Sequence, residues 1–398
     1  MPEFQDIALR LLAYCADNQW AGYDPYDALN SKVFRALPFI KSRYARLALT
    51  QGMKRSPLNL RPLLLVPKTP NPKGLALFVS ALVKLAKLNL LEKPALLEMA
   101  VDLLMDSRSK ESIYSCWGYN FDWQSRTALV PKGTPNVICT SFAANALLDL
   151  YEFTRGAEYL SMAKSAAEFI LKVLYREAPA CYFAYTPMER PPVHNASLMG
   201  AALLSRVFKE TGDVSWLKPA LKAARYSVQK QHSNGSWAYG ELDTQGWIDN
   251  FHTGFNLCAL RRIAGYADTR EFEASLQTGF TFYQSHFFEN GCIPKYYHNN
   301  TYPIDIHSIA QSIITLVAFE DFGKQNISQA ESILVWAVEH FWSPRNYFYF
   351  QKGRFFTNRI PYMRWSQAWM LLAIASLLET QVPHEIQKRT STKIHSFS

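Results

Sequence analysis

Three of the nine histidines of the chain stand near the start of an apolar segment, at matching positions: His194, His252 and His307. Imidazole gains and loses a proton near neutral pH, so histidines that converge on one site indicate proton transfer or a substrate clamp. Asp249 lies three residues before His252, a spacing that puts both side chains on one side of a first helical turn. A carboxylate so placed fixes the imidazole tautomer and raises its basicity. The sequence therefore predicts Asp249 and His252 as a catalytic pair.

Asp305 and His307 repeat this pairing less regularly, because only one residue separates them. Asp249, Asp305 and Asn195 are also residue types that commonly cap the start of a helix by accepting backbone hydrogen bonds. A purely structural role for these three side chains therefore stays open beside the catalytic one.

Carboxylates in the loops suggest a different reaction. Hydrolysis of a glycosidic bond needs two of them, about 5–5.5 Å apart for retention or 6.5–9.5 Å apart for inversion. Epimerisation or elimination at a uronate instead needs a base near the acidic C–H, with neutral or cationic groups on the carboxylate, and the histidines, Asn195 and Arg364 suit that chemistry. Both reactions stay open. The predicted catalytic residues are Asp249, His252, His194, His307, Asp305 and Asp122.

Substrate-binding candidates come from polar helix starts, aromatic loops and the N-terminal motif GYDPYDALNS. Aromatic rings stack on the apolar faces of sugars, although core packing accounts for many of them equally well. The candidates are Tyr23, Asp24, Asp27, Trp117, Asn195, Trp237, Glu241, Tyr297, Arg364, Trp365 and Gln367. No HxH or HExxH spacing, CxxC pair, glycine-rich phosphate loop or dinucleotide fingerprint is present, so we expect neither a metal nor a cofactor.

The elements that position these residues follow a repeat. Apolar helical segments begin near residues 73, 138, 194, 251, 306 and 363, and the last five starts are 55–57 residues apart. A helix that is apolar all round is a buried helix. Amphipathic, charged helices alternate with them, and the sequence places these at 39–53, 93–107, 156–175, 213–231, 268–286 and 326–342.

The connections between these helices are unequal. Those from buried to amphipathic helix are short, whereas those in the other direction are long and combine aromatic residues with Gly or Asn, which suggests short hairpins. Such segments lie at 116–124, 181–187, 234–240, 290–297 and 346–355. Six buried and six amphipathic helices in alternation predict an all-α closed double ring with its long loops on one face.

With this period, this loop asymmetry and tags such as NGSWAYG before a buried helix, residues 39–380 resemble the six-hairpin, or (α/α)6 toroid, superfamily. Its members include glycosidases, N-acylglucosamine 2-epimerases and polysaccharide lyases. The motif GYDPYDALNS is similar to one in toroid proteins of bacterial exopolysaccharide synthesis clusters. The resemblance implies a carbohydrate-active enzyme of polysaccharide metabolism that uses general acid–base chemistry on a glycan, with possible partners in a synthesis complex.

Three segments are expected along the chain of 398 residues. Residues 1–38 form an N-terminal helix and loop that pack on the ring, residues 39–381 form the toroid, and residues 382–398 form a flexible basic tail. No apolar run is long enough to predict a transmembrane helix. No signal peptide is recognisable, and the six cysteines are scattered, so we expect a cytoplasmic protein.

The net charge of +9 favours anionic partners. Outside the basic tail we interpret this excess as spread along the chain, and no nucleic-acid-binding motif accompanies it. An anionic oligosaccharide or polysaccharide is therefore the expected ligand. Two other classes stay open: a non-catalytic module that binds a polysaccharide or a partner, and an isoprenoid cyclase-like enzyme, which would need a deep apolar cavity with an acid at its floor.

Overall fold

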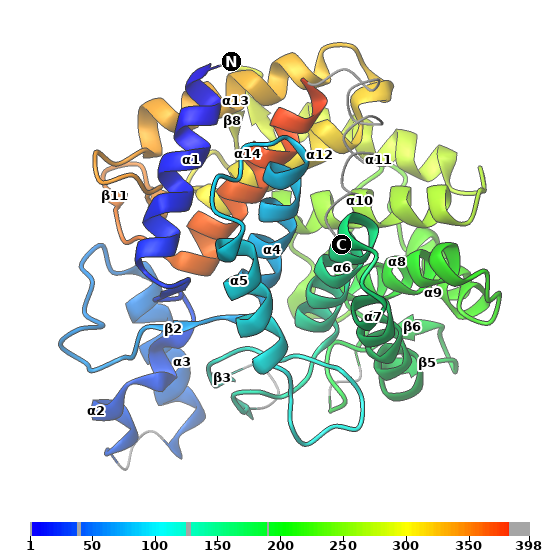
Figure 1. Ribbon diagram of the computed structural model, residues 1–398, viewed down its shortest axis with the longest axis horizontal. Coiled ribbons are helices and arrows are strands. Elements are labelled where there is room, and N and C mark those ends of the chain that lie inside the picture. The colour runs from blue at the N-terminus through cyan, green and yellow to red at the C-terminus, as the bar shows by residue number, and fades with distance from the viewer. Residues whose placement is uncertain (1, 38–40, 125–128, 189–190, 382–398) are drawn as a thin grey trace.

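A closed ring of inner helices forms the centre of the molecule (Figure 1). The computed structural model describes residues 2–37, 41–124, 129–188 and 191–381. Each inner helix contacts the next one along the chain, and the last contacts the first, which closes the ring. All six predicted starts are confirmed to within one residue. The inner helices are α4 (Pro72–Lys87), α6 (Val137–Thr154), α8 (His194–Thr211), α10 (Asn250–Tyr266), α12 (Ile306–Ala318) and α14 (Trp369–Thr380), the last preceded by the π-helical turn η6 (Met363–Ala368).

A second layer of helices covers the outside of this ring, one on each inner helix. Their amphipathic patterns fit this position, because one face packs on an inner helix and the other faces solvent. They are α5 (Ala95–Asp106) on α4, α7 (Ala157–Phe169) on α6, α9 (Leu217–Gln229) on α8, α11 (Glu273–His286) on α10, α13 (Asn326–Phe341) on α12 and α1 (Pro2–Asp17) on α14. The π-helical turn η3 (Ile170–Leu174) extends α7.

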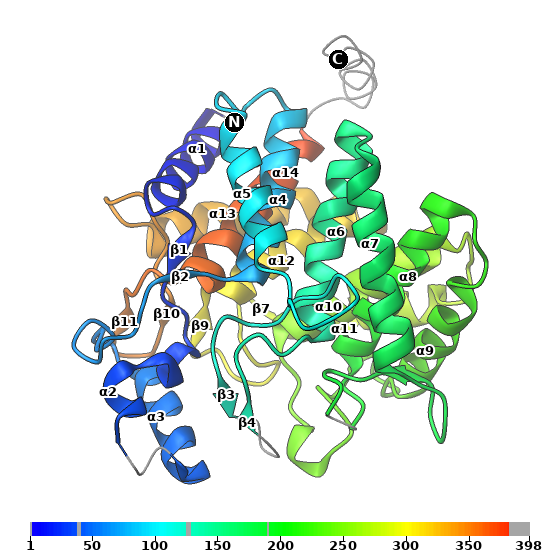
Figure 2. The same ribbon diagram turned by 60° about the horizontal axis from the view of Figure 1, so that its bottom comes forward.

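The sixth outer position is filled differently from the expectation. The helix predicted at 39–53 forms as α3 (Arg43–Arg55), but its main contacts are with the 3₁₀ turn η1 (Asp27–Asn30) and with strand β3. The N-terminal helix α1 packs on α14 in its place. With the short helix α2 (Lys32–Arg35), α3 stands at one edge of the molecule, outside the double ring (Figures 1 and 2).

Small antiparallel hairpins occupy the long connections, as predicted, and Figure 2 shows β3–β4 and β10–β11 together on one side of the inner helices. Residues 234–240 are the exception, because they form a turn and an isolated bridge between Gly240 and Val193. The 3₁₀ turns η4 (Asp243–Gln245) and η5 (Glu320–Phe322) lie in two connections. The paired strands are β1 (Ala21–Gly22) with β2 (Thr69–Pro70), β3 (Trp123–Gln124) with β4 (Leu129–Val130), β5 (Tyr175–Arg176) with β6 (Tyr182–Phe183), β7 (Phe288–Glu289) with β8 (Ile293–Pro294), and β10 (Gln351–Lys352) with both β11 (Thr357–Asn358) and β9 (Ile304–Asp305).

None of the described helices combines the length and the apolar character that crossing a bilayer requires. The cysteines, all within the described ranges, form no disulfide. The basic tail expected at 382–398 lies outside the described residues.

Candidate active site

Backbone hydrogen bonds between neighbouring repeats fix the start of the inner helices. In five of them the first helical residue donates its N–H to the carbonyl of an aromatic residue in another connection. Polar side chains at these starts are therefore held together on the loop side of the ring. The donor and acceptor pairs are Val137 and Tyr185, His194 and Tyr239, Asn250 and Tyr296, Ile306 and Phe350, and Met363 and Tyr23.

Asp249 and His252 form the pair that their spacing predicts. Oδ2 of Asp249 lies 2.7 Å from Nδ1 of His252 and also accepts a hydrogen bond from the indole N–H of Trp247 at 3.0 Å. Oδ1 of Asp249 caps α10 by accepting the backbone N–H of His252 at 2.9 Å. The structural and the catalytic interpretations thus apply to the same carboxylate.

The bond to Asp249 sets the tautomer of His252. Because a carboxylate only accepts, Nδ1 carries the hydrogen, which leaves Nε2 with a free lone pair. The His252 side chain is 22% exposed, whereas that of Asp249 is 1% exposed. The rings of Tyr239 and Phe251 flank the imidazole at 4.6 and 4.3 Å between centroids. An oriented base with a solvent-facing nitrogen can take a proton from a bound substrate.

Asp305 and His307 do not form the expected side-chain pair. Oδ1 of Asp305 accepts the backbone N–H of His307 and the indole N–H of Trp365, both at 2.9 Å, and Oδ2 accepts from Gln351 at 3.0 Å. Because only one residue separates Asp305 from His307, the carboxylate contacts the backbone of His307 instead of its ring. Burial raises the pKa of Asp305 to about 6.

His307 has a buried ring, and neither of its nitrogens has a hydrogen-bond partner within the part of the chain that the structure describes. It lies among Phe251, Trp365 and Trp369, each with its ring centroid 4.5 Å away. Burial, and then the nearby Lys73, hold the pKa of His307 well below its usual range, so the imidazole is neutral. A neutral imidazole among aromatic rings can donate or accept one hydrogen bond to a ligand.

Lys73 is a central residue that the sequence analysis missed. It is 4% exposed, and its Nζ lies over the rings of Phe142, Trp369 and Phe255 at 4.6, 5.1 and 5.4 Å from their centroids. Burial, and then Arg364, lower its pKa to about 7. No acidic side chain pairs with it among the described residues. In the sequence, the feature that indicates Lys73 is a charged residue at the start of a helix whose following residues are almost all apolar.

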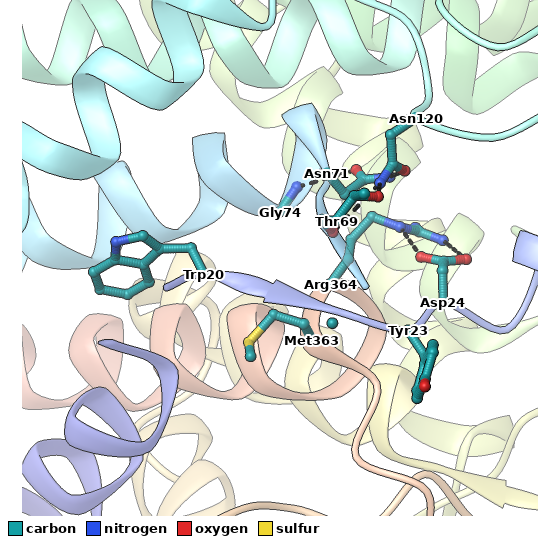
Figure 3. Close-up of a pocket in the computed structure, with 10 residues that line it drawn as sticks. Trp20, Tyr23, Asp24, Thr69, Asn71, Gly74, Asn120, Met363 and Arg364 are labelled. Carbon is teal, nitrogen blue, oxygen red and sulfur yellow. Dashed lines mark hydrogen bonds and ion pairs between the residues drawn. The ribbon is translucent and has the colours of Figure 1, made fainter. Parts of the chain in front are cut away.

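Arg364 and the N-terminal motif are held together by ion pairs. Nε and Nη2 of Arg364 bind both carboxylate oxygens of Asp24 at 2.5 and 2.8 Å, and Arg61 binds Asp27 at 2.6 Å. Figure 3 shows the Arg364–Asp24 pair beside a small pocket lined also by Tyr23 and Asn120. The charges of Asp24, Asp27 and Arg364 are thus paired within the protein, and their role in substrate binding stays a prediction.

Several other candidates have structural partners. Trp117 and Trp237 are fully buried and donate to the carbonyls of Leu104 and Ser227. Gln367 bonds both the N–H and the carbonyl of Phe348. Asp122 pairs with Arg35 at 3.0 Å near the surface. Each of these four residues therefore has a structural role, and a further role at the site stays a prediction.

The remaining candidates lie around the loops on the open side of the ring. Burial lowers the pKa of His194 to about 4. Glu241 accepts from the hydroxyl of Tyr226 at 2.6 Å and pairs with Lys230 at 3.4 Å. Asn195 is buried, and its Oδ1 has no hydrogen-bond partner among the described residues. The Tyr297 ring lies tilted against that of Tyr296, with 4.6 Å between the centroids. Among the described residues, no group of His, Cys, Asp or Glu is arranged to hold a metal ion.

Comparison with known proteins identifies the fold. No protein-family model and no curated protein matches the sequence. The cellobiose 2-epimerase of Bacillus thermoamylovorans has a TM-score of 0.62 at 12% identity, over 80% of this chain and 90% of that one. An unsaturated glucuronyl hydrolase specific for heparin has a TM-score of 0.62 at 13% identity, over 95% and 97% of the two chains.

A third similar structure is the family GH76 α-mannanase of Bacteroides thetaiotaomicron, with a TM-score of 0.59 at 13% identity over 78% of this chain and 87% of that one. At such low identity the likeness concerns the fold. The closed inner ring, its outer layer and this likeness together show that the chain is an (α/α)6 toroid.

Proposed function

We propose that this protein is an enzyme that moves a proton on an acidic sugar or glycan, by epimerisation or elimination, with His252 as the base. The observation that carries the proposal is the Asp249–His252 pair, in which the buried carboxylate binds Nδ1 and the imidazole side chain stays 22% exposed. The named activities of the similar structures, a sugar 2-epimerase and a glucuronyl hydrolase, support a carbohydrate substrate.

The proton transfer follows from the geometry. Nε2 of His252 removes a proton from a carbon next to a carbonyl or carboxylate, and the buried Asp249 stabilises the imidazolium that forms. The negative charge that develops on the substrate needs cations nearby. Lys73 supplies one, because its ammonium group has no counter-ion within the described residues. The same charge favours a substrate that carries a carboxylate.

The state of the carboxylates argues against glycoside hydrolysis. Asp249 and Asp305 use both of their oxygens as acceptors for protein donors. Asp122 and Glu241 pair with cations outside the inner ring. A retaining or inverting mechanism needs one protonated carboxyl group and one carboxylate on either side of the bond, each with an oxygen that can reach the substrate. The acid–base chemistry of histidine fits the site better.

Lys73 also argues against an isoprenoid cyclase. The rings of Phe142, Phe255 and Trp369 form an apolar surface of the kind that such an enzyme needs. However, the ammonium group of Lys73 lies over these same rings and would repel a carbocation formed there. The neutral imidazole of His307 also offers a lone pair that would capture it.

The experiment is hydrogen–deuterium exchange at the substrate. The purified protein is incubated in D₂O with uronic acids, neutral sugars and acidic oligosaccharides, and NMR follows loss of the C–H signal and any new epimer or double bond. Exchange that requires His252 but survives His340→Ala, a control histidine on α13, supports the proposal. Release of new reducing ends without exchange indicates hydrolysis instead, and binding without turnover indicates a non-catalytic module.

A further inference from the structure

The positive charge of the chain is concentrated in one stretch, contrary to the expectation of a spread-out excess. Residues 28–91 contain twelve Lys or Arg residues and no Asp or Glu. That excess is larger than the net charge of +9, so the rest of the chain is slightly acidic. Much of the stretch forms the edge that stands outside the double ring: α2, α3 and the loop that leads to β2 (Figures 1 and 2). We call residues 32–37 and 41–68 the basic lobe.

The loop at the end of this lobe exposes four leucines within eight residues. Leu58, Leu60, Leu63 and Leu65 are 69%, 39%, 76% and 56% exposed, and Tyr44 on α3 is 80% exposed. Single exposed apolar residues are ordinary, but a contiguous group marks a surface that another molecule covers.

The leucines are held outward by a rigid base. Arg61, between them in the chain, is fully buried and donates to Asp27 at 2.6 Å and to the carbonyl of Asp24 at 2.8 Å. The hydroxyl of Ser31 donates to the carbonyl of Leu64 at 2.6 Å. Val66 packs in a small separate core with Ala28 and Met53. The loop is therefore anchored at its backbone while its leucine side chains face solvent.

Exposed cations lie in the same stretch of the chain as these leucines. Lys32, Lys41, Arg55 and Lys68 are exposed. Arg35 pairs with Asp122, but the stretch itself contains no acid that could neutralise the others. Exposed leucines bordered by Lys and Arg match a surface with an apolar interior beneath negatively charged groups, which describes an anionic phospholipid membrane.

We propose that the basic lobe docks the protein on an anionic lipid surface. The leucines enter the boundary between headgroups and acyl chains, and the cations lie at the phosphates. Nucleic acid fits less well, because a phosphate backbone offers no apolar layer for four leucines. The contact is peripheral and is independent of the reaction proposed for the ring.

The same helix connects this surface to the candidate active site. On the face of α3 turned toward the ring, Nζ of Lys54 donates to the hydroxyl of Tyr26 at 2.7 Å and lies 5.8 Å from the ring centroid of Trp365. Through Lys54, α3 thus contacts residues next to the candidate site while its other side belongs to the basic lobe.

The test is co-sedimentation with vesicles of phosphatidylcholine alone or mixed with phosphatidylglycerol. We expect binding to the mixed vesicles that falls at least ~10-fold when salt is raised, since exposed charges are screened over about 8 Å at physiological ionic strength. The triple variant Leu58→Ser, Leu63→Ser, Leu65→Ser and the charge variant Lys32→Glu, Lys68→Glu should each lower binding by ~10-fold or more. Thermal melts verify that both variants fold.

The matched control removes exposed apolar residues elsewhere. Ile113→Ser and Val214→Ser, at positions 91% and 70% exposed, should bind as the wild type does. Absence of binding to the mixed vesicles at low salt, or equal binding to both kinds, overturns the proposal. A second outcome also overturns the proposal: the protein does not bind vesicles, but sedimentation velocity shows a dimer that the leucine variant abolishes. The leucines would then contact a second copy of the chain. Tight binding of an RNA or DNA duplex that the leucine variant does not weaken also contradicts the proposal.

Discussion

Nδ1 of His252 and Oδ2 of Asp249 lie 2.7 Å apart, and that oxygen also accepts the indole N–H of Trp247. Oδ2 of Asp249 accepts two hydrogen bonds, and Oδ1 accepts the backbone N–H at the start of α10. These three bonds fix the orientation of the carboxylate. The imidazole is therefore fixed in both orientation and tautomer, with Nε2 toward the open face.

Replacement of His252 by Ala should remove most of the proton exchange. Loss of a general base typically costs about 10²–10⁴-fold in rate. The fold should persist, because the side chain is partly exposed and the cap of α10 uses the backbone N–H of His252. Exchange rates beside a thermal melt test this. A near-normal rate would show that the pair is structural.

Asp249→Asn should lower both activity and stability. Asparagine keeps a carbonyl oxygen for the cap, but its amide group then faces the N–H groups of Trp247 and His252, which need an acceptor. A buried donor left without a partner costs about 1–3 kcal/mol. Chemical denaturation measures that loss, and stability equal to the wild type would contradict the hydrogen-bond arrangement.

Lys73→Met should stabilise the protein at neutral pH while weakening binding of acidic sugars. Burial lowers the pKa of Lys73 from 10.5 to about 7 in the folded state. Between these values the unfolded chain binds a proton that the folded chain releases, so the stability of the wild type rises with pH across this window. Below pH 7 the folded state bears the full cost of the buried charge, which the aromatic faces offset in part.

The variant, which has no titrating group at residue 73, should therefore gain ~1–4 kcal/mol at pH 7 and below, and the gain should shrink toward pH 10. Urea unfolding at several pH values measures the difference. Lys87→Met, at an exposed position on the same helix, is the control. A gain that does not depend on pH would show that the charge of Lys73 is not its cause.

Breaking the Arg364–Asp24 pair should destabilise the fold strongly. Both side chains are almost fully buried, so Arg364→Met leaves an uncompensated carboxylate and should cost about 3–5 kcal/mol. The double variant with Asp24→Asn should lose less than Arg364→Met alone, because no charge then remains. Unfolding free energies of the single and double variants measure this coupling, and a double variant as unstable as the sum of both singles would refute it.

Gly22→Ala should strain the closure of the ring. A Cβ at Gly22 would lie 2.6 Å from Cβ of Met363 and would press strand β1 away from η6. Overpacking of this kind typically costs about 1–3 kcal/mol. Gly52→Ala, within α3 and with open space around the added Cβ, should leave stability unchanged or raise it by up to about 1 kcal/mol. The difference between the two melts tests the closure directly.

The fold was largely predictable because buried helices carry an unmistakable composition. Six segments with few charges, the last five of them 55–57 residues apart, predict all the inner helix starts. The outer layer was harder at one place, because an amphipathic pattern shows that a helix has an apolar face but not which neighbour covers it. The assignment of 39–53 to the ring instead of α1 came from that ambiguity.

The site was predictable only where contacts are local. Asp249 and His252 are three residues apart, so helical geometry relates them. Arg364 and Asp24 are separated by most of the chain, and nothing in either segment indicates that they neutralise each other. The environment of Lys73 consists of three rings from α6, α10 and α14, which are distant from it in the sequence, so the sequence alone does not indicate its role.

The closure of the ring by α1 on α14 also bears on how the fold responds to local opening. The contact joins segments that are separated in the sequence by the five other inner helices, and the carbonyl of Tyr23 accepts the N–H of Met363 across the same junction. In open helical repeats each unit contacts only its sequence neighbours, so the ends can separate independently. In a closed ring the first and last inner helices also contact each other, so separation of either one breaks contacts on both of its sides.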